Sequence, residues 1–175
     1  MKEDRFWTIV ESARGTGTYS VEEHLSALKH VLSDLTDREL AEFQLLLYQL
    51  QAKAYSWDLW GAAVVINGGC GDDGFTDFRT GLIFQGRDLF EKALDDPDSL
   101  CELENAPNLI EYELLGYAAD YVFEERTGQI DLWSHFDEVT SVYKPVQDPT
   151  GEPWGDDDEL EGRFPQLSAR FGVLY

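Results

Sequence analysis

The chain has 175 residues, the usual length of one domain, and 43% of them are hydrophobic, which excludes a wholly disordered protein. Its 35 acidic residues outnumber its 13 basic residues, so the formal net charge is −22. A surface this negative repels phosphate backbones and anionic lipid headgroups, which argues against a nucleic-acid or membrane partner.

The first residues, Met1 to Arg14, mix charged and apolar side chains and lack the apolar run of a secretory signal. The longest apolar stretch, Leu59 to Ile66, is too short to span a bilayer. Cys70 and Cys101 are the two cysteines, and in a chain with an ample core they are typical of reduced thiols. The sequence therefore predicts a cytoplasmic protein.

The N-terminal third predicts helices with recognisable ends. Apolar side chains recur at helical spacing from Phe6 to Ala13, and Gly15-Thr16-Gly17 ends that helix. Two capping boxes, in which a hydroxyl and a carboxylate each accept from a free backbone N–H, predict the next helix starts: Ser20 with Glu23, and Thr36 with Glu39. Apolar stripes over residues 25–32 and 40–54 follow them.

Residues 57–67 are apolar on nearly every face, which predicts a helix at the centre of the core. The β-branched residues Val64, Val65 and Ile66 leave a buried strand as the alternative for that piece. Asp72 or Asp73 is expected to cap the following helix, and Gly86 to interrupt it. Further along, Asn108 and Glu111 predict the start of a helix that Gly128 ends.

The helical pattern fades after about residue 140, where four of the six prolines and the acidic run 156–159 fall. We therefore expect a helical core domain over residues 1–140 and an irregular segment over residues 141–175 packed on it. Trp154, Phe164 and Phe171 are the expected anchors of that segment. The predicted fold is mainly α: one compact helical domain with an irregular, Pro-rich, acidic C-terminal wrap.

The most unusual segment, residues 67–79, holds four glycines and lies between two apolar helices. It supports three chemical hypotheses: a reactive Cys70 whose pKa is lowered by a helix N-terminus, a metal site made of Asp72, Asp73 and Asp77, or a backbone nest for an anion. The alternative is a structural turn, in which Asp72 or Asp73 caps the helix and pairs with Arg79.

Conventional catalytic motifs are missing from the sequence. The histidines His24, His30 and His135 are the candidate bases for a cysteine nucleophile, and none lies near Cys70 along the chain. The sequence contains no HExxH, paired CxxC, Walker A or dinucleotide fingerprint, so it predicts no cofactor.

The acidic run from Gly155 to Glu161 fails the calcium-loop template, because Leu160 and Glu161 stand where a ligand and a glycine are needed. A solvated acidic segment explains it better, and docking on a basic partner is a further hypothesis for the same residues. If Asp156, Asp157, Asp158 and Glu159 form that docking site, neutralising them should slow association with the partner.

Several segments together resemble a bacterial family of proteins, family 4240 of the domains of unknown function. They include Phe6-Trp7, the stretch 58–63, the glycine-rich stretch 67–75, Phe78-Arg79 and Gly151-Glu152-Pro153-Trp154. The resemblance extends over nearly the whole chain. It implies a bacterial, soluble, single-domain protein and transfers no reaction and no catalytic residue.

The favoured interpretation is an acidic, non-enzymatic domain that acts by binding another protein, a basic surface being the complementary one. The alternative is a small enzyme, or a metal- or anion-binding site, built on the loop from Gly68 to Arg79 with Cys70, Asp72, Asp73 and Arg79 around it.

Overall fold

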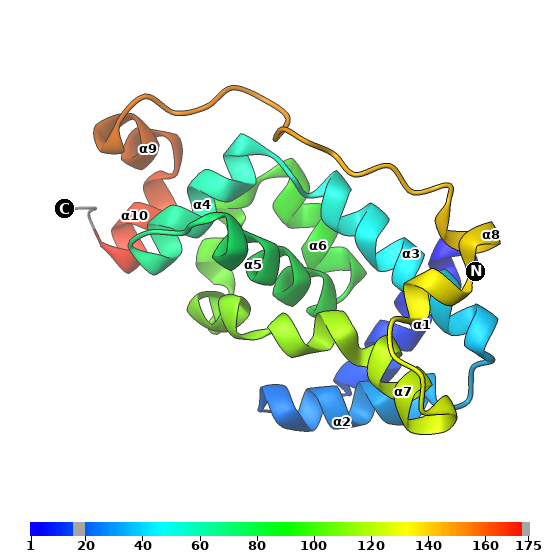
Figure 1. Cartoon of the computed structure of the whole chain (residues 1–175). Coiled ribbons are helices and arrows are strands. Elements are labelled where there is room, and N and C mark those ends of the chain that lie inside the picture. Colours follow the sequence, from blue (N-terminus) through cyan, green and yellow to red (C-terminus); the bar gives the residue numbers. More distant parts are fainter. Residues whose placement is uncertain (16–19, 173–175) are drawn as a thin grey trace.

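The computed structural model describes residues 1–15 and 20–172, and within them it contains helices and connecting segments but no strand (Figure 1). The α-helices are α1 (Glu3–Arg14), α2 (Val21–Leu32), α3 (Asp37–Lys53), α4 (Trp57–Asn67), α5 (Asp72–Phe84), α6 (Arg87–Asp95), α7 (Ala118–Thr127), α8 (Asp137–Thr140), α9 (Asp157–Arg163) and α10 (Pro165–Phe171). The 3₁₀ helices are η1 (Pro97–Glu102), η2 (Ala106–Glu111), η3 (Glu113–Tyr117) and η4 (Leu132–His135). The mainly helical fold class is confirmed.

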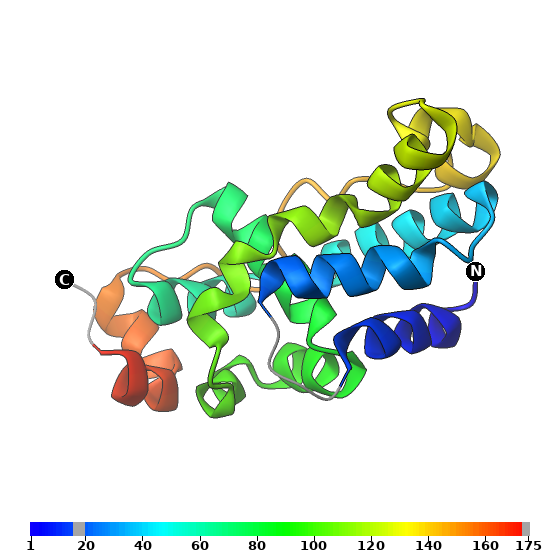
Figure 2. The ribbon, with the colours of Figure 1, turned by 90° about the horizontal axis from the view of Figure 1, so that it is seen from below.

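Both capping boxes form as the sequence predicts. Ser20 and Glu23 close the start of α2, and Thr36 and Glu39 close the start of α3. Gly15 ends α1 with a φ of 62°; Thr16 and Gly17 lie outside the described residues. α1 and α2 then lie side by side in opposite directions, as Figure 2 shows.

The ambiguous stretch Val64 to Ile66 is helical and belongs to α4. α4 can be apolar on nearly every face because α5 packs on one side and the C-terminal helices α9 and α10 pack on another. Leu160 of α9 and Phe164 approach Gly61 so closely that a Cβ there would lie 2.7 and 2.9 Å from them. α5, rather than α4, is the most central helix, since it contacts α1, α3, α4, α6, η2 and η3.

Two predicted helix starts are wrong. The N-cap of α5 is Gly71, and Asp72 and Asp73 stand in the first helical turn without a capping hydrogen bond. The helix expected to begin with a cap formed by Asn108 and Glu111 is instead divided into η2, η3 and α7. Gln44 Nε2 donates to the carbonyl of Gly116 at 3.0 Å, so α3 contacts the chain where η3 gives way to α7.

The C-terminal part is only partly irregular. An extended segment, residues 143–155, runs along the outside of α3 and α4 (Figure 1). It is attached to the link between these two helices, because Thr150 exchanges backbone hydrogen bonds with Tyr55 and Trp57. Residues 157–171 then form α9 and α10. The number of prolines argued against helices here, but Pro165 lies in the first turn of α10, where a helix tolerates proline. The carboxylate of Asp98 accepts from the backbone N–H groups of Gln166 and Leu167 and fixes that turn.

The expected anchors of this segment are in place, with Phe164 buried and Trp154 and Phe171 packed against the core. Across the part of the chain described, no helix combines the length and the apolar character needed to cross a bilayer.

Candidate functional site

Three adjoining hollows run along the surface between α3, α5, η3 and α7, and Tyr48 of α3 lines all of them. Their volumes are about 400, 90 and 440 Å³. We call them together the tyrosine groove, because five tyrosines form its walls: Tyr48, Tyr55, Tyr117, Tyr121 and Tyr143. A groove of this size accommodates a short peptide or another small ligand.

The aromatic wall is a packed cluster around Tyr48. Its ring lies 4.9 Å from that of Trp133 and 5.7 Å from that of Tyr143, so η4 and the C-terminal segment both meet α3 here. Several large apolar side chains remain exposed along the groove, with Tyr117, Val146 and Ile130 at 46%, 45% and 72%. Exposed rings and aliphatic groups in one hollow provide contact area for a partner.

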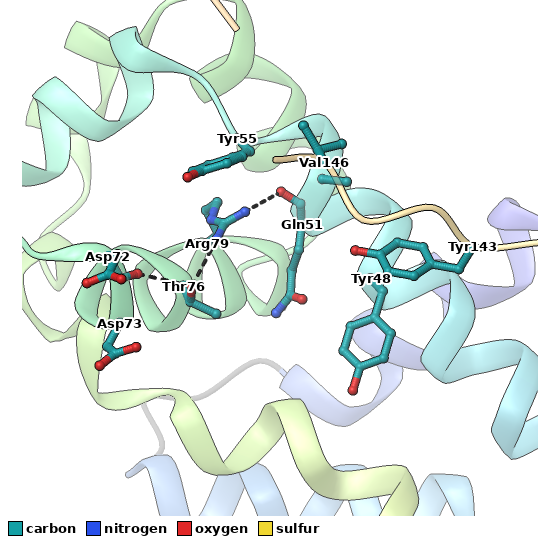
Figure 3. Close-up of a pocket in the computed structure, with 10 residues that line it drawn as sticks. Tyr48, Gln51, Tyr55, Asp72, Asp73, Thr76, Arg79, Tyr143 and Val146 are labelled. Atoms are coloured by element: carbon teal, nitrogen blue, oxygen red, sulfur yellow. Dashed lines mark hydrogen bonds between the residues drawn. The ribbon is translucent and has the colours of Figure 1, made fainter. Parts of the chain in front are cut away.

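Arg79 lines the hollow of about 400 Å³, which we call the α5 end of the groove, and Figure 3 shows it between Tyr55 and Thr76. Its Nη1 donates to the Gln51 carbonyl at 2.8 Å, its Nη2 to Thr76 Oγ1 at 2.9 Å and its Nε to the Phe75 carbonyl at 3.2 Å. The guanidinium also stacks on the rings of Tyr55 and Phe75, at 4.6 and 4.9 Å from their centres. These contacts hold it in one orientation.

The expected ion pair between Arg79 and Asp72 or Asp73 does not form. Among the described residues no carboxylate comes within ion-pair distance of this guanidinium. Burial lowers the pKa of Arg79, which its place among aromatic rings explains. The structural role of Arg79 is therefore to tie α5 to the end of α3 through the Gln51 carbonyl.

Carboxylates line the groove along its whole length: Asp72, Asp73, Asp77, Glu113, Asp120, Glu124 and Asp131. None of them forms an ion pair within the part of the chain that is described. Burial, together with the charges of Glu113 and Asp73, raises the pKa of Asp77. Burial raises the pKa of Asp120 as well, and the charge of Asp131 adds to it. Neighbouring carboxylates of the groove therefore repel one another at Asp77 and at Asp120.

The glycine-rich loop is accounted for by helix termination. Gly68 ends α4 in the left-handed conformation, with a φ of 66°, and Gly69 follows with a φ of 138°. The N–H groups of both residues donate to the Val64 carbonyl, so these two groups are not free for an anion nest, one of the three hypotheses for this loop. Trp60 Nε1 then fixes the loop by donating to the Cys70 carbonyl at 2.8 Å.

Cys70 does not show the electrostatics of an activated nucleophile. Burial, helped by the charge of Asp77, raises the pKa of its thiol to about 11, whereas the helix dipole was expected to lower it. Both cysteines are free thiols. Nor is there any group of three His, Cys, Asp or Glu side chains arranged to hold a metal among residues 1–15 and 20–172.

The match to a family model agrees with the resemblance seen in the sequence. Residues 1–125 match the model described as protein of unknown function DUF4240. The chain belongs to this family. The match covers α1 to most of α7 and includes the walls of the groove that come from α3, α5 and η3, while Gly151–Trp154 and the C-terminal helices lie beyond it. No curated protein and no solved structure matches the chain significantly.

The raised pKa of Cys70 gives this DUF4240 protein a testable reactivity. In a Cys101→Ser variant, iodoacetamide should alkylate native Cys70 at pH 8 roughly 100-fold more slowly than the unfolded chain, because about two pKa units separate the two thiols. The rate should keep rising with pH up to about 11. An alkylation rate that levels off below about pH 8 would contradict the raised pKa of Cys70 and make it a candidate nucleophile again.

The acidic run near the C-terminus has structural roles. Asp156 caps α9 by accepting from the Glu159 N–H at 2.9 Å, and Glu159 accepts from the Gly155 N–H and pairs with Arg163. These hydrogen bonds lower the pKa of Glu159. Two of the acids proposed as a docking site are therefore already engaged within the fold.

Proposed function

We propose that this protein acts by binding, and that a basic segment of another protein occupies the tyrosine groove. The single observation that carries the proposal is the row of seven carboxylates along the groove, none of which forms an ion pair within the described residues. Like charges repel one another at Asp77 and at Asp120, where neighbouring acids help to raise the pKa. A ligand with lysine or arginine side chains relieves this repulsion. The net charge of −22 then attracts such a ligand from a distance.

The aromatic wall favours the same ligand. Tyrosine faces attract cationic side chains, and the attraction grows as the cation loses water. Tyr48 and Tyr117 stand beside the carboxylates of α5 and α7, so one lysine or arginine of the ligand can contact a ring and a carboxylate together. The ring of Tyr121 already has Lys29 over it, 5.7 Å from its centre. The exposed Ile130 and Val146 offer apolar surface for the stems of these long side chains.

The groove competes with the segment 156–159 as the docking site, and the contacts favour the groove. Asp156 accepts the hydrogen bond that caps α9, and Glu159 forms an ion pair with Arg163. Asp77, Glu113 and Glu124 of the groove form no ion pair in the described chain. The two free thiols are consistent with the reducing cytoplasm that we propose for the protein.

A fluorescein-labelled oligo-lysine peptide tests the proposal by fluorescence anisotropy. The triple variant Asp77→Asn/Glu113→Gln/Glu124→Gln should bind it about tenfold more weakly than wild type, since three partly exposed ion pairs at about 0.5 kcal/mol each are lost. The salt dependence of binding should flatten as well.

The matched control changes the same charge elsewhere. Asp34, Asp95 and Glu104 are exposed carboxylates outside the groove, and the variant Asp34→Asn/Asp95→Asn/Glu104→Gln has the same net charge, −22 + 3 = −19. It should bind within about twofold of wild type, because long-range attraction between exposed charges is screened by salt. If both triple variants bind the peptide equally weakly, binding depends only on the total charge of the protein, and the proposal is overturned.

A further inference from the structure

The groove is not uniform in charge. Its lining carboxylates extend from α5 to α7, but a single cationic side chain, Arg79, lines the hollow of about 400 Å³ at its α5 end. A basic peptide that occupies the carboxylate-lined part would therefore meet a fixed positive charge at this end. The occupant should carry a negative group there.

Arg79 has capacity for such a group. A guanidinium has five N–H donors, and the structure gives it three hydrogen bonds, to Phe75, Gln51 and Thr76. Five other arginines hold a carboxylate within the described chain: Arg5, Arg38, Arg87, Arg126 and Arg163. Arg14 and Arg170, like Arg79, donate to a backbone carbonyl instead, but neither of them lines the groove. In a protein with 35 acidic residues, Arg79 forms no ion pair within the described chain and lines a hollow instead.

The surroundings of Arg79 fit a carboxylate better than a phosphate. Asp72 and Asp73 stand on the same hollow, one turn before Thr76, and they would repel a doubly charged group. The terminal carboxylate of a chain that ends in a basic residue carries a single charge and would lie at Arg79. The positive side chain of that basic residue would then lie near these two aspartates. Tyr55 and Phe75 cover the guanidinium, with ring centres 4.6 and 4.9 Å away, so the ion pair would be partly removed from water.

We propose that the groove recognises the C-terminal end of a basic protein segment, with its terminal carboxylate bound by Arg79 and its basic side chains along the carboxylates of α5 and α7. This inference rests on the proposed function and names the part of the partner that enters the groove. The Arg79 fork selects the chain end, and the row of carboxylates selects the residues before it.

The test compares oligo-lysine peptides of one length, labelled at the N-terminus, that end in a free carboxylate, in a carboxamide, or in a glutamate carboxamide. Wild type should bind the free acid roughly tenfold more tightly than either amide. Arg79→Gln should bind the acid and the lysine amide equally, and Arg79→Lys should retain part of the difference. Melting curves of both variants identify any loss of folding, and the comparison of peptides on wild type needs no variant.

Arg170→Gln is the matched control, because Arg170 also stacks on a ring, that of Phe171, and lies outside the groove. It should keep the full preference for the free acid. Equal binding of acid and lysine amide by wild type would overturn this inference and leave the proposed function standing. Tight binding of the glutamate amide would overturn the assignment to a chain end, and failure of every peptide to bind would overturn the proposed function together with the inference.

Discussion

Replacing Gly81 by alanine is expected to lower the free energy of unfolding by about 3 kcal/mol or more, at the upper end of overpacking effects. A Cβ at this position would lie 2.3 Å from the Leu109 carbonyl oxygen and 2.9 Å from two further Leu109 backbone atoms. Backbone cannot rotate away as a side chain can, so η2 would have to move away from α5. Urea denaturation of wild type and variant measures the change.

Gly74→Ala is the matched control for this substitution. Gly74 belongs to the same helix, and its Cβ would meet only Cys70 Sγ, at the ordinary distance of 3.6 Å. Alanine is the better helix former, so this variant should be as stable as wild type or more stable by up to about 1 kcal/mol. Equal stability of the Gly81 and Gly74 variants would contradict the close packing of α5 against η2.

The second large effect concerns acid pH and His24. This side chain of α2 is only 3% exposed, its ring stands edge-on to Phe84 and Tyr112, and its Nε2 has no hydrogen-bond partner within the described part of the chain. Burial, assisted by the charge of Arg14, lowers the pKa of His24 to about 4. The native state therefore holds it neutral through mildly acidic conditions.

Stability should fall as the pH falls, because the unfolded chain binds a proton at His24 near pH 6.5 and the native chain does so only near 4. Above about pH 6.5 both states are neutral at this residue and it makes no contribution. Between these values the loss amounts to about 3 kcal/mol in total. Denaturation curves of wild type and His24→Leu, taken from pH 7 to 4, should diverge by that amount, with the variant losing less.

The carboxylates titrate in both proteins and cancel in this comparison. His30→Gln serves as the control, since His30 is exposed on the same helix and its variant should follow the wild-type pH dependence. Parallel curves for wild type and His24→Leu would contradict the burial of a neutral imidazole.

Local signals predicted the N-terminal half of the fold well. The capping boxes at Ser20 and Thr36 and the glycine stop at Gly68 depend on residues within one helical turn, and all of them form. Tertiary contacts accompany two of the failures, the helix expected after Asn108 and the unpredicted α10, whereas the failed cap at Asp72 or Asp73 is a local one. The division of the helix expected after Asn108 coincides with contacts from Gln44 and α5, and α10 begins on Asp98, far from it in sequence.

The groove was not predictable from the sequence. Tyr48 and Gln51 fall outside the apolar stripe of α3, which was the only available signal that they face something other than the core. Their neighbours Tyr117 and Tyr143 come from distant segments that only the fold brings together. Arg79 and the acids at 72 and 73 were singled out for an ion pair and a cap, and the structure places them on one hollow without either contact.

Backbone chemical-shift mapping tests the central claim most directly. ¹⁵N-labelled protein titrated with the oligo-lysine free acid should show its largest shifts at Gln51, Thr80, Tyr117 and Glu124 and at their neighbours in the groove. Shifts concentrated at residues 156–161, or spread evenly over the acidic surface, would contradict the account that the tyrosine groove binds a basic segment.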